Sequence, residues 1–105
     1  MTWLRALLLL ALVATAGPAA AQPVSLSALA GNPVRYDHRT VTVTGTVGLV
    51  EGAGGAWSFT LIDGGVSIRV LATGGRPPRT GDRVEVEGLF KLAGREIDAL
   101  RVTPR

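Results

Sequence analysis

Alternation of apolar and polar residues constrains this chain more than any other feature. From residue 40 to residue 50, valines alternate with threonines, a period of two that is typical of a half-buried β-strand. The side chains expected on the buried face are Val41, Val43, Val47 and Leu49. Gly45 and Gly48 interrupt the pattern, and a glycine within a strand commonly marks a bend, a bulge or a close approach of two backbones. We therefore expect a long first strand that bends and pairs on both sides of a small barrel.

Four further segments show strand patterns and are separated by turn-forming residues. They cover residues 57–62, 66–72, 83–90 and 96–103. Asp63-Gly64-Gly65 predicts a tight turn between the first two, because glycine adopts a positive φ without steric cost. The side chains expected to face inward are Trp57, Phe59, Leu61, Val66, Ile68, Val70, Val84 and Val86. In the last segment Ile97 and Ala99 share one face and Leu100 and Val102 the other, so we expect a bulge near Ala99 or a strand buried on both faces.

Residues 22–38 form a lead-in to the strands and contain one short predicted helix. Ser25 suits the N-cap of this helix, and Leu26 and Leu29 give it an apolar side. We expect the helix to cover one open end of the barrel. A turn is expected at His38, because histidine tolerates the left-handed backbone conformation better than most residues.

The first 21 residues have the three parts of a secretory signal peptide. Arg5 precedes an apolar run over residues 6–14, and Ala19-Ala20-Ala21 forms a cleavage site. Gly17-Pro18 ends the apolar run before it reaches the roughly 20 residues that a membrane-spanning helix needs. We therefore expect cleavage after Ala21 and export to the periplasm or the medium, without a membrane anchor. An uncleaved anchor is the alternative.

Charge and residue types argue against several functional classes. The chain has 11 Lys and Arg against 8 Asp and Glu, so removal of Arg5 leaves an excess of two, far from the clustered excess of a strong nucleic-acid binder. It has no cysteine and a single histidine, His38, whereas a zinc site needs three or four ligands. Glu85 and Glu87 share the outer face of one strand, and no pair of carboxylates is placed across a cleft. We expect a non-enzymatic protein without a metal ion or cofactor.

Four runs of the sequence together resemble an OB-fold domain, over roughly residues 39–102. They are RTVTVTGTV, FTLIDGGVSIRV, GDRVEVEGLF and REIDALRV. The pattern is similar to small exported bacterial OB-fold proteins and to nucleic-acid-binding domains of the anticodon-binding type. The resemblance implies an all-β protein, with a five-stranded OB-fold Greek-key barrel over residues 39–105. The short N-terminal helix and the cleaved signal peptide predicted above precede this barrel. One departure is the connection at residues 73–82, which is rich in glycine and proline where many OB-folds have a helix.

The strand pattern also resembles the haem chaperone of cytochrome c maturation, another exported OB-fold family. That family has a membrane anchor and a haem-binding histidine near its C-terminus. This chain ends at Pro104-Arg105 and has its histidine at position 38, so no haem site is carried over. A haem-handling role is therefore the least favoured hypothesis.

Ligands of OB-folds bind on the second and third strands and the loops beside them. The residues expected there are Ser58, Thr60, Ser67 and Arg69 on the strands, with Lys91 and Arg95 in the loop before the last strand. These side chains form hydrogen bonds and attract anions, but they include no ring on which a base stacks. We therefore favour a protein or small anionic ligand, bound at a rim formed by residues 51–56 and 91–95. The alternative is weak, salt-sensitive binding of nucleic acid on the same surface. Scattered solubilising charges would produce the same pattern.

Overall fold

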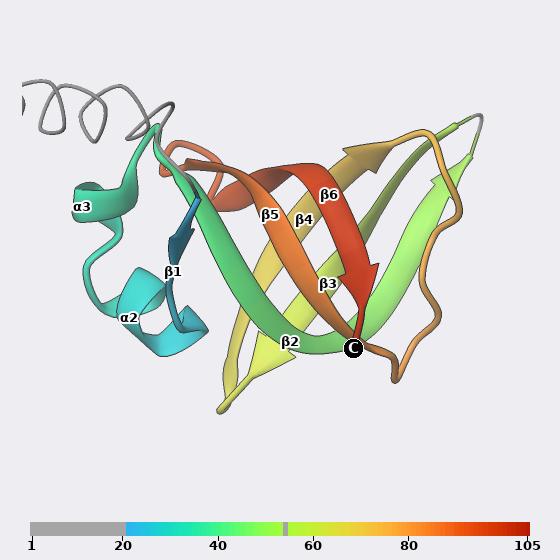
Figure 1. The fold of residues 1–105 in the computed structure, drawn as a ribbon, viewed down its shortest axis with the longest axis horizontal. Helices are drawn as coiled ribbons and strands as arrows, with labels where there is room; N and C mark the ends of the chain where they lie inside the picture. Colours follow the sequence, from blue (N-terminus) through green and yellow to red (C-terminus); the bar gives the residue numbers. More distant parts are fainter. Residues whose placement is uncertain (1–20, 54) are drawn as a thin grey trace, which may run out of the picture.

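The strands close into a five-stranded barrel. The computed structural model describes residues 21–53 and 55–105, so the predicted signal peptide, apart from Ala21, lies outside the described residues (Figure 1). In the described ranges the strands are β1 (Gln22–Pro23), β2 (Thr40–Ala53), β3 (Ala56–Asp63), β4 (Val66–Thr73), β5 (Arg83–Lys91) and β6 (Glu96–Pro104). Their order in the sheet is β1-β2-β3-β4-β6-β5, and pairing of β2 with β5 closes the barrel. This is the OB-fold barrel that the sequence predicted, and β1 is an additional short strand parallel to β2.

The long strand β2 pairs with β5 along its first half and with β3 along its second, as predicted. Gly45 lies at the change of partner, where a Cβ atom would come within 2.8 Å of the carbonyl oxygen of Ile62. The register of β2 against β3 then shifts between Val47 and Val50, which inserts one extra residue. The bulge turns Leu49 outward, and its side chain is 66% exposed. The prediction that Leu49 lies in the core is wrong because one added residue reverses the alternation.

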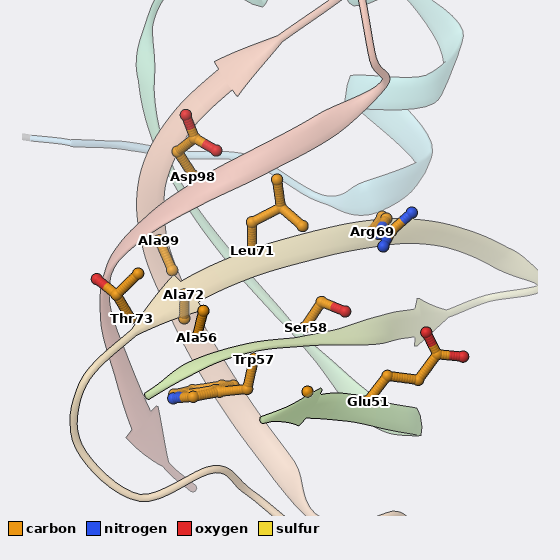
Figure 2. Close-up of a pocket in the computed structure, with 11 residues that line it drawn as sticks. Glu51, Ala56, Trp57, Ser58, Arg69, Leu71, Ala72, Thr73, Asp98 and Ala99 are labelled. Atoms are coloured by element: carbon orange, nitrogen blue, oxygen red, sulfur yellow. The ribbon is translucent and has the colours of Figure 1, made fainter. Parts of the chain in front are cut away.

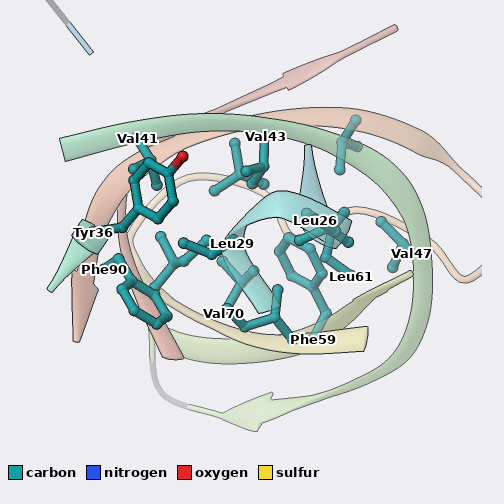
Figure 3. Packing of buried hydrophobic residues seen from close by; sticks show 14 residues of the cluster. Leu26, Leu29, Tyr36, Val41, Val43, Val47, Phe59, Leu61, Val70 and Phe90 are labelled. Carbon is teal, nitrogen blue, oxygen red and sulfur yellow. The ribbon is translucent and has the colours of Figure 1, made fainter. Parts of the chain in front are cut away.

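Two short helices precede the barrel in the described residues, α2 (Leu26–Gly31) and α3 (Pro33–Tyr36). The Ser25 hydroxyl accepts a hydrogen bond from the backbone N–H of Ala28 at 3.0 Å, which confirms the predicted N-cap. Leu26 and Leu29 are each 1% exposed and belong to the barrel core (Figure 3). Helix α2 therefore covers one end of the barrel, as predicted. The second helix, α3, was not expected.

A second bulge lies in the pairing of β5 with β6. Glu87 pairs with Arg101 and Gly88 with Ala99, so Leu100 has no partner on β5 and is 71% exposed. This is the bulge predicted near Ala99. It changes the face on which the residues of β6 lie, and so it reconciles the two apolar patterns in that segment.

Strands β4 and β6 are paired over a short stretch only. They run parallel, with three partner pairs between residues 69–71 of β4 and residues 96–98 of β6. The rest of β4 pairs with β3 alone, and the rest of β6 pairs with β5 alone. The barrel wall is therefore least continuous between β4 and β6.

Candidate functional site

A groove of about 600 Å³ lies at the place where β4 and β6 part (Figure 2). Ser58 on β3 pairs with Leu71 on β4, which in turn pairs with Asp98 on β6. Arg69 is two residues before Leu71, so its side chain leaves the same face of the sheet. Figure 2 shows Ser58, Arg69 and Leu71 directed to one side of the strands. The groove thus combines a hydroxyl, a guanidinium and an apolar surface.

Arg69 carries the positive charge of this groove. The ion pairs within the described residues join Asp37 to His38, Lys91 to Asp98 and Glu85 to Arg105. None of them includes Arg69, which is exposed on β4. Glu51 lines the groove near the end of β2. A ligand therefore meets a cation at one part of the groove and a carboxylate at another.

Lys91 is already engaged with an anion. Its Nζ atom lies 2.6 Å from Oδ2 of Asp98, which lines the groove. The hydrogen bond to this carboxylate, followed by its charge, raises the pKa of Lys91 above the ordinary value of 10.5. Because its pKa is raised in the folded state, Lys91 keeps its proton at neutral pH, and its stabilising charge is lost only as the pH rises through the higher value. At neutral pH Lys91 thus offsets Asp98 and offers less to a ligand than Arg69 does.

The six predicted site residues do not form one cluster. Ser58 and Arg69 line the groove together, and Thr60 pairs with Arg69 on the neighbouring strand. Ser67 and Arg95 instead border a separate pocket of about 80 Å³ beside helix α2. Two of the six residues therefore share the main groove.

The two loops of the predicted rim lie apart. In Figure 1 the end of β2 and the start of β3 lie at the right of the barrel, and the β5–β6 connection lies at the left. Residues 51, 52 and 56 line the groove, whereas none of residues 91–95 does. The expectation of a single rim is therefore wrong, because the strands of the closed barrel carry the two connections to different ends. The face of β3, β4 and β6 lies between them.

Trp57 is the residue whose surroundings the sequence misjudged. Phe59 and Leu61 are buried, as predicted, but Trp57 on the same strand is half-buried and lines the groove. Its Nε1–H donates to the carbonyl oxygen of Gly74 at 2.8 Å. The alternation correctly indicated the face of the strand that carries Trp57. It carried no signal that this residue lies near the end of the barrel, where the inner face meets solvent.

Metal binding finds no support in the described part of the chain. No group of three or more His, Cys, Asp or Glu side chains that could hold a metal ion is present among the residues that the structure describes. The same residues contain no helix that is long and apolar enough to cross a membrane.

Comparison with solved structures shows the same fold in larger proteins. A protein described as an aspartyl-tRNA synthetase from Leishmania major Friedlin superposes with a TM-score of 0.67 at 15% identity, over 83% of this chain and 21% of that protein. A structure of yeast Stn1 and Ten1 superposes with a TM-score of 0.68 at 10% identity, over 82% of this chain and 63% of that chain. This chain thus matches less than two thirds of either protein, and at these identities the likeness shows the fold alone. No protein-family model and no curated protein sequence matches the chain.

Proposed function

We propose that this chain is a non-enzymatic binding domain that holds single-stranded nucleic acid weakly in the groove across β3, β4 and β6. The observation that carries the proposal is the position of Arg69, outside the ion pairs of the described residues, beside Ser58 in an open groove of about 600 Å³. A guanidinium binds phosphate in a fork of two hydrogen bonds, and a hydroxyl adds a further donor. One protein with a similar fold is described as a tRNA synthetase, which supports a nucleic acid as the ligand class.

The charges of the groove imply low affinity. Glu51 and Asp98 line the same groove as Arg69, and the Lys91 charge offsets Asp98. Few cations are therefore free to displace counterions from phosphates. Each phosphate contact contributes about −0.7 to the slope of log K against log salt for single strands, so Arg69 alone gives a shallow slope. We expect binding that is detectable at low salt and weak at physiological salt.

Fluorescence anisotropy of a labelled single-stranded oligonucleotide, measured across a salt series, tests this proposal. Loss of one phosphate contact in Arg69→Ala should lower the affinity at low salt and reduce the slope by about 0.7. Arg83→Ala is the matched control, since Arg83 is an exposed strand arginine that does not line the groove. The control should behave like the unaltered protein. Equal losses in both variants, or binding that resists salt, would contradict the proposal.

A protein segment of mixed charge is the second candidate ligand. Glu51 favours it, because a carboxylate repels phosphate but pairs with lysine or arginine of a partner. Leu71 adds an apolar contact in the same groove. Absence of oligonucleotide binding at low salt would favour this candidate over nucleic acid.

We also propose that the chain is exported and cleaved after Ala21. The support is the order of Arg5, the apolar run and the alanine cleavage site in the sequence. Strand β1 begins at Gln22, so this cleavage leaves every strand of the barrel intact. Mass spectrometry of periplasmic and secreted fractions should find a mature protein that begins at Gln22. Recovery of intact chain from membranes alone would overturn the proposal.

A further inference from the structure

A second groove adjoins the first and shares one wall with it. This groove has a volume of about 230 Å³ and is lined by Trp57, by residues 72–76 and by residues 99–102. Trp57, Ala72, Thr73 and Ala99 line both grooves. We call the second one the Trp57 slot. Its volume is below the range typical of pockets for drug-sized ligands, so it suits a small planar group.

Two contacts fix the indole of Trp57 where it lines the slot. Its Nε1–H donates a hydrogen bond to the carbonyl oxygen of Gly74, and its ring stacks on that of Phe59 with centroids 5.8 Å apart and planes 19° apart. Gly52 leaves the space for this arrangement, since a Cβ there would lie 2.8 Å from Cβ of Trp57. The side chain is nonetheless half-buried rather than buried. A fixed aromatic ring with part of its surface exposed costs little entropy when a second ring packs against it.

Among the described residues, two arginines and no carboxylate line the slot. Arg76 follows Gly74-Gly75, Arg101 lies on β6, and both are exposed. Neither takes part in the ion pairs found in the described part of the chain. In the strand register Arg101 lies opposite Glu87 and Arg69 lies opposite Glu96, whereas Arg76 lies in a connection outside the strands. Arg69 lines the first groove, the other two arginines line the slot, and Trp57 lines both.

We propose that the Trp57 slot is a subsite for one unpaired base of a single-stranded nucleic acid, which packs against the indole while Arg76 and Arg101 face its phosphates. This subsite rests on the proposed function, because the nucleic acid bound beside Arg69 would continue past the end of β4 into the slot. The charge around the slot favours a base with its phosphates over an aromatic side chain of a protein. The slot supplies the aromatic surface that the outward residues of β3 and β4 lack.

Tryptophan emission tests the subsite directly. The chain has tryptophan at positions 3 and 57, so the full chain carrying Trp3→Phe reports on Trp57 alone. This variant is titrated at low salt with a single-stranded oligonucleotide and, separately, with an abasic strand of the same length. Fluorescence anisotropy of labelled forms of the two strands measures the affinity of each. The base-bearing strand should quench Trp57 emission and the abasic strand should not. Since a stacked base contributes about a 5- to 150-fold gain in affinity, the abasic strand should bind more weakly by that factor.

The outcomes separate the slot from the groove. Binding of both strands with equal affinity and unchanged Trp57 emission would overturn the slot and leave the groove proposal in place. Absence of anisotropy change with either strand would overturn both proposals. Arg76→Ala should weaken binding and reduce the salt slope without changing the midpoint of unfolding, because Arg76 is exposed in a connection. An unchanged affinity and slope in this variant would also contradict the slot.

Discussion

Gly88 lies where the backbone leaves no room for a side chain. A Cβ atom at this position would be 2.4 Å from the carbonyl oxygen of Asp98 and 2.9 Å from Cα of Ala99. Both obstacles are backbone atoms of β6, at the bulge that leaves Leu100 unpaired. The close approach of β5 and β6 therefore depends on glycine at this residue.

Substitution of Gly88 by alanine should destabilise the protein by about 2–3 kcal/mol, because the strand pairing must shift to admit the methyl group. Gly31→Ala is the matched control, since Gly31 ends helix α2 and a Cβ there would meet no described atom within 4 Å beyond its own helix and chain neighbours. The control should be stabilised by about 0.5–1 kcal/mol, because alanine has less backbone entropy to lose. Urea unfolding of both variants measures the difference. Similar midpoints for the two would contradict the described bulge.

For single residues of the site, the sequence predicted the face of the strand but not the position along the barrel. The face on which Ser58 and Arg69 lie could be predicted, because alternation along a strand fixes the side to which each residue points and their neighbours Phe59, Ile68 and Val70 are buried. Alternation does not encode depth along the barrel, so the partial exposure of Trp57 had no signal in the sequence. The separation of Arg95 from Arg69 depends on which connection lies at which end, and this too is a property of the closed barrel.

At the scale of elements, the sequence predicted the five barrel strands but not the effect of the β2 bulge or the short strand β1. The five predicted strands correspond to β2 to β6, and the bulge near Ala99 follows from the broken alternation of β6. The bulge in β2 was signalled by Gly48, but its direction was not, and Leu49 was therefore placed on the wrong side. Strand β1 has only two residues, which is too short for any periodic pattern.

Helix α2 covers one end of the barrel although it precedes all five barrel strands in the sequence. The connection from β4 to β5 lacks a helix, and the end of the barrel is covered by Leu26 and Leu29 from the N-terminal side. The apolar side of a predicted helix and the need to close a barrel together indicated this cover. The one-turn helix α3 was missed. It begins at Pro33, and proline is common both at the first position of a helix and just after the end of one.

At the scale of the whole molecule, the fold and the distribution of charge point to a binding surface on one side of the barrel. The wall opposite the groove, where β2 pairs with β5, is a continuous ladder over residues 40–46 and 83–89. The wall between β4 and β6 has three partner pairs, and both grooves border it. A groove of about 580 Å³ also lies on the β2–β5 wall, but Arg105 there is paired with Glu85, which leaves Arg83 as its one arginine outside the ion pairs of the described residues. The two grooves beside β4 and β6 have three such arginines, Arg69, Arg76 and Arg101, so we expect the ligand on that side.

Amide chemical-shift mapping of the full chain tests this central claim most directly. A single strand of about ten nucleotides, within the range that OB-folds cover, is added at low salt to the isotope-labelled protein. We predict that the amide resonances of Ser58, Arg69 and Leu71 shift, while those of Thr42 and Thr44 on the β2–β5 wall stay in place. Shifts centred on Thr42 and Thr44, or no shifts at all, would contradict the account.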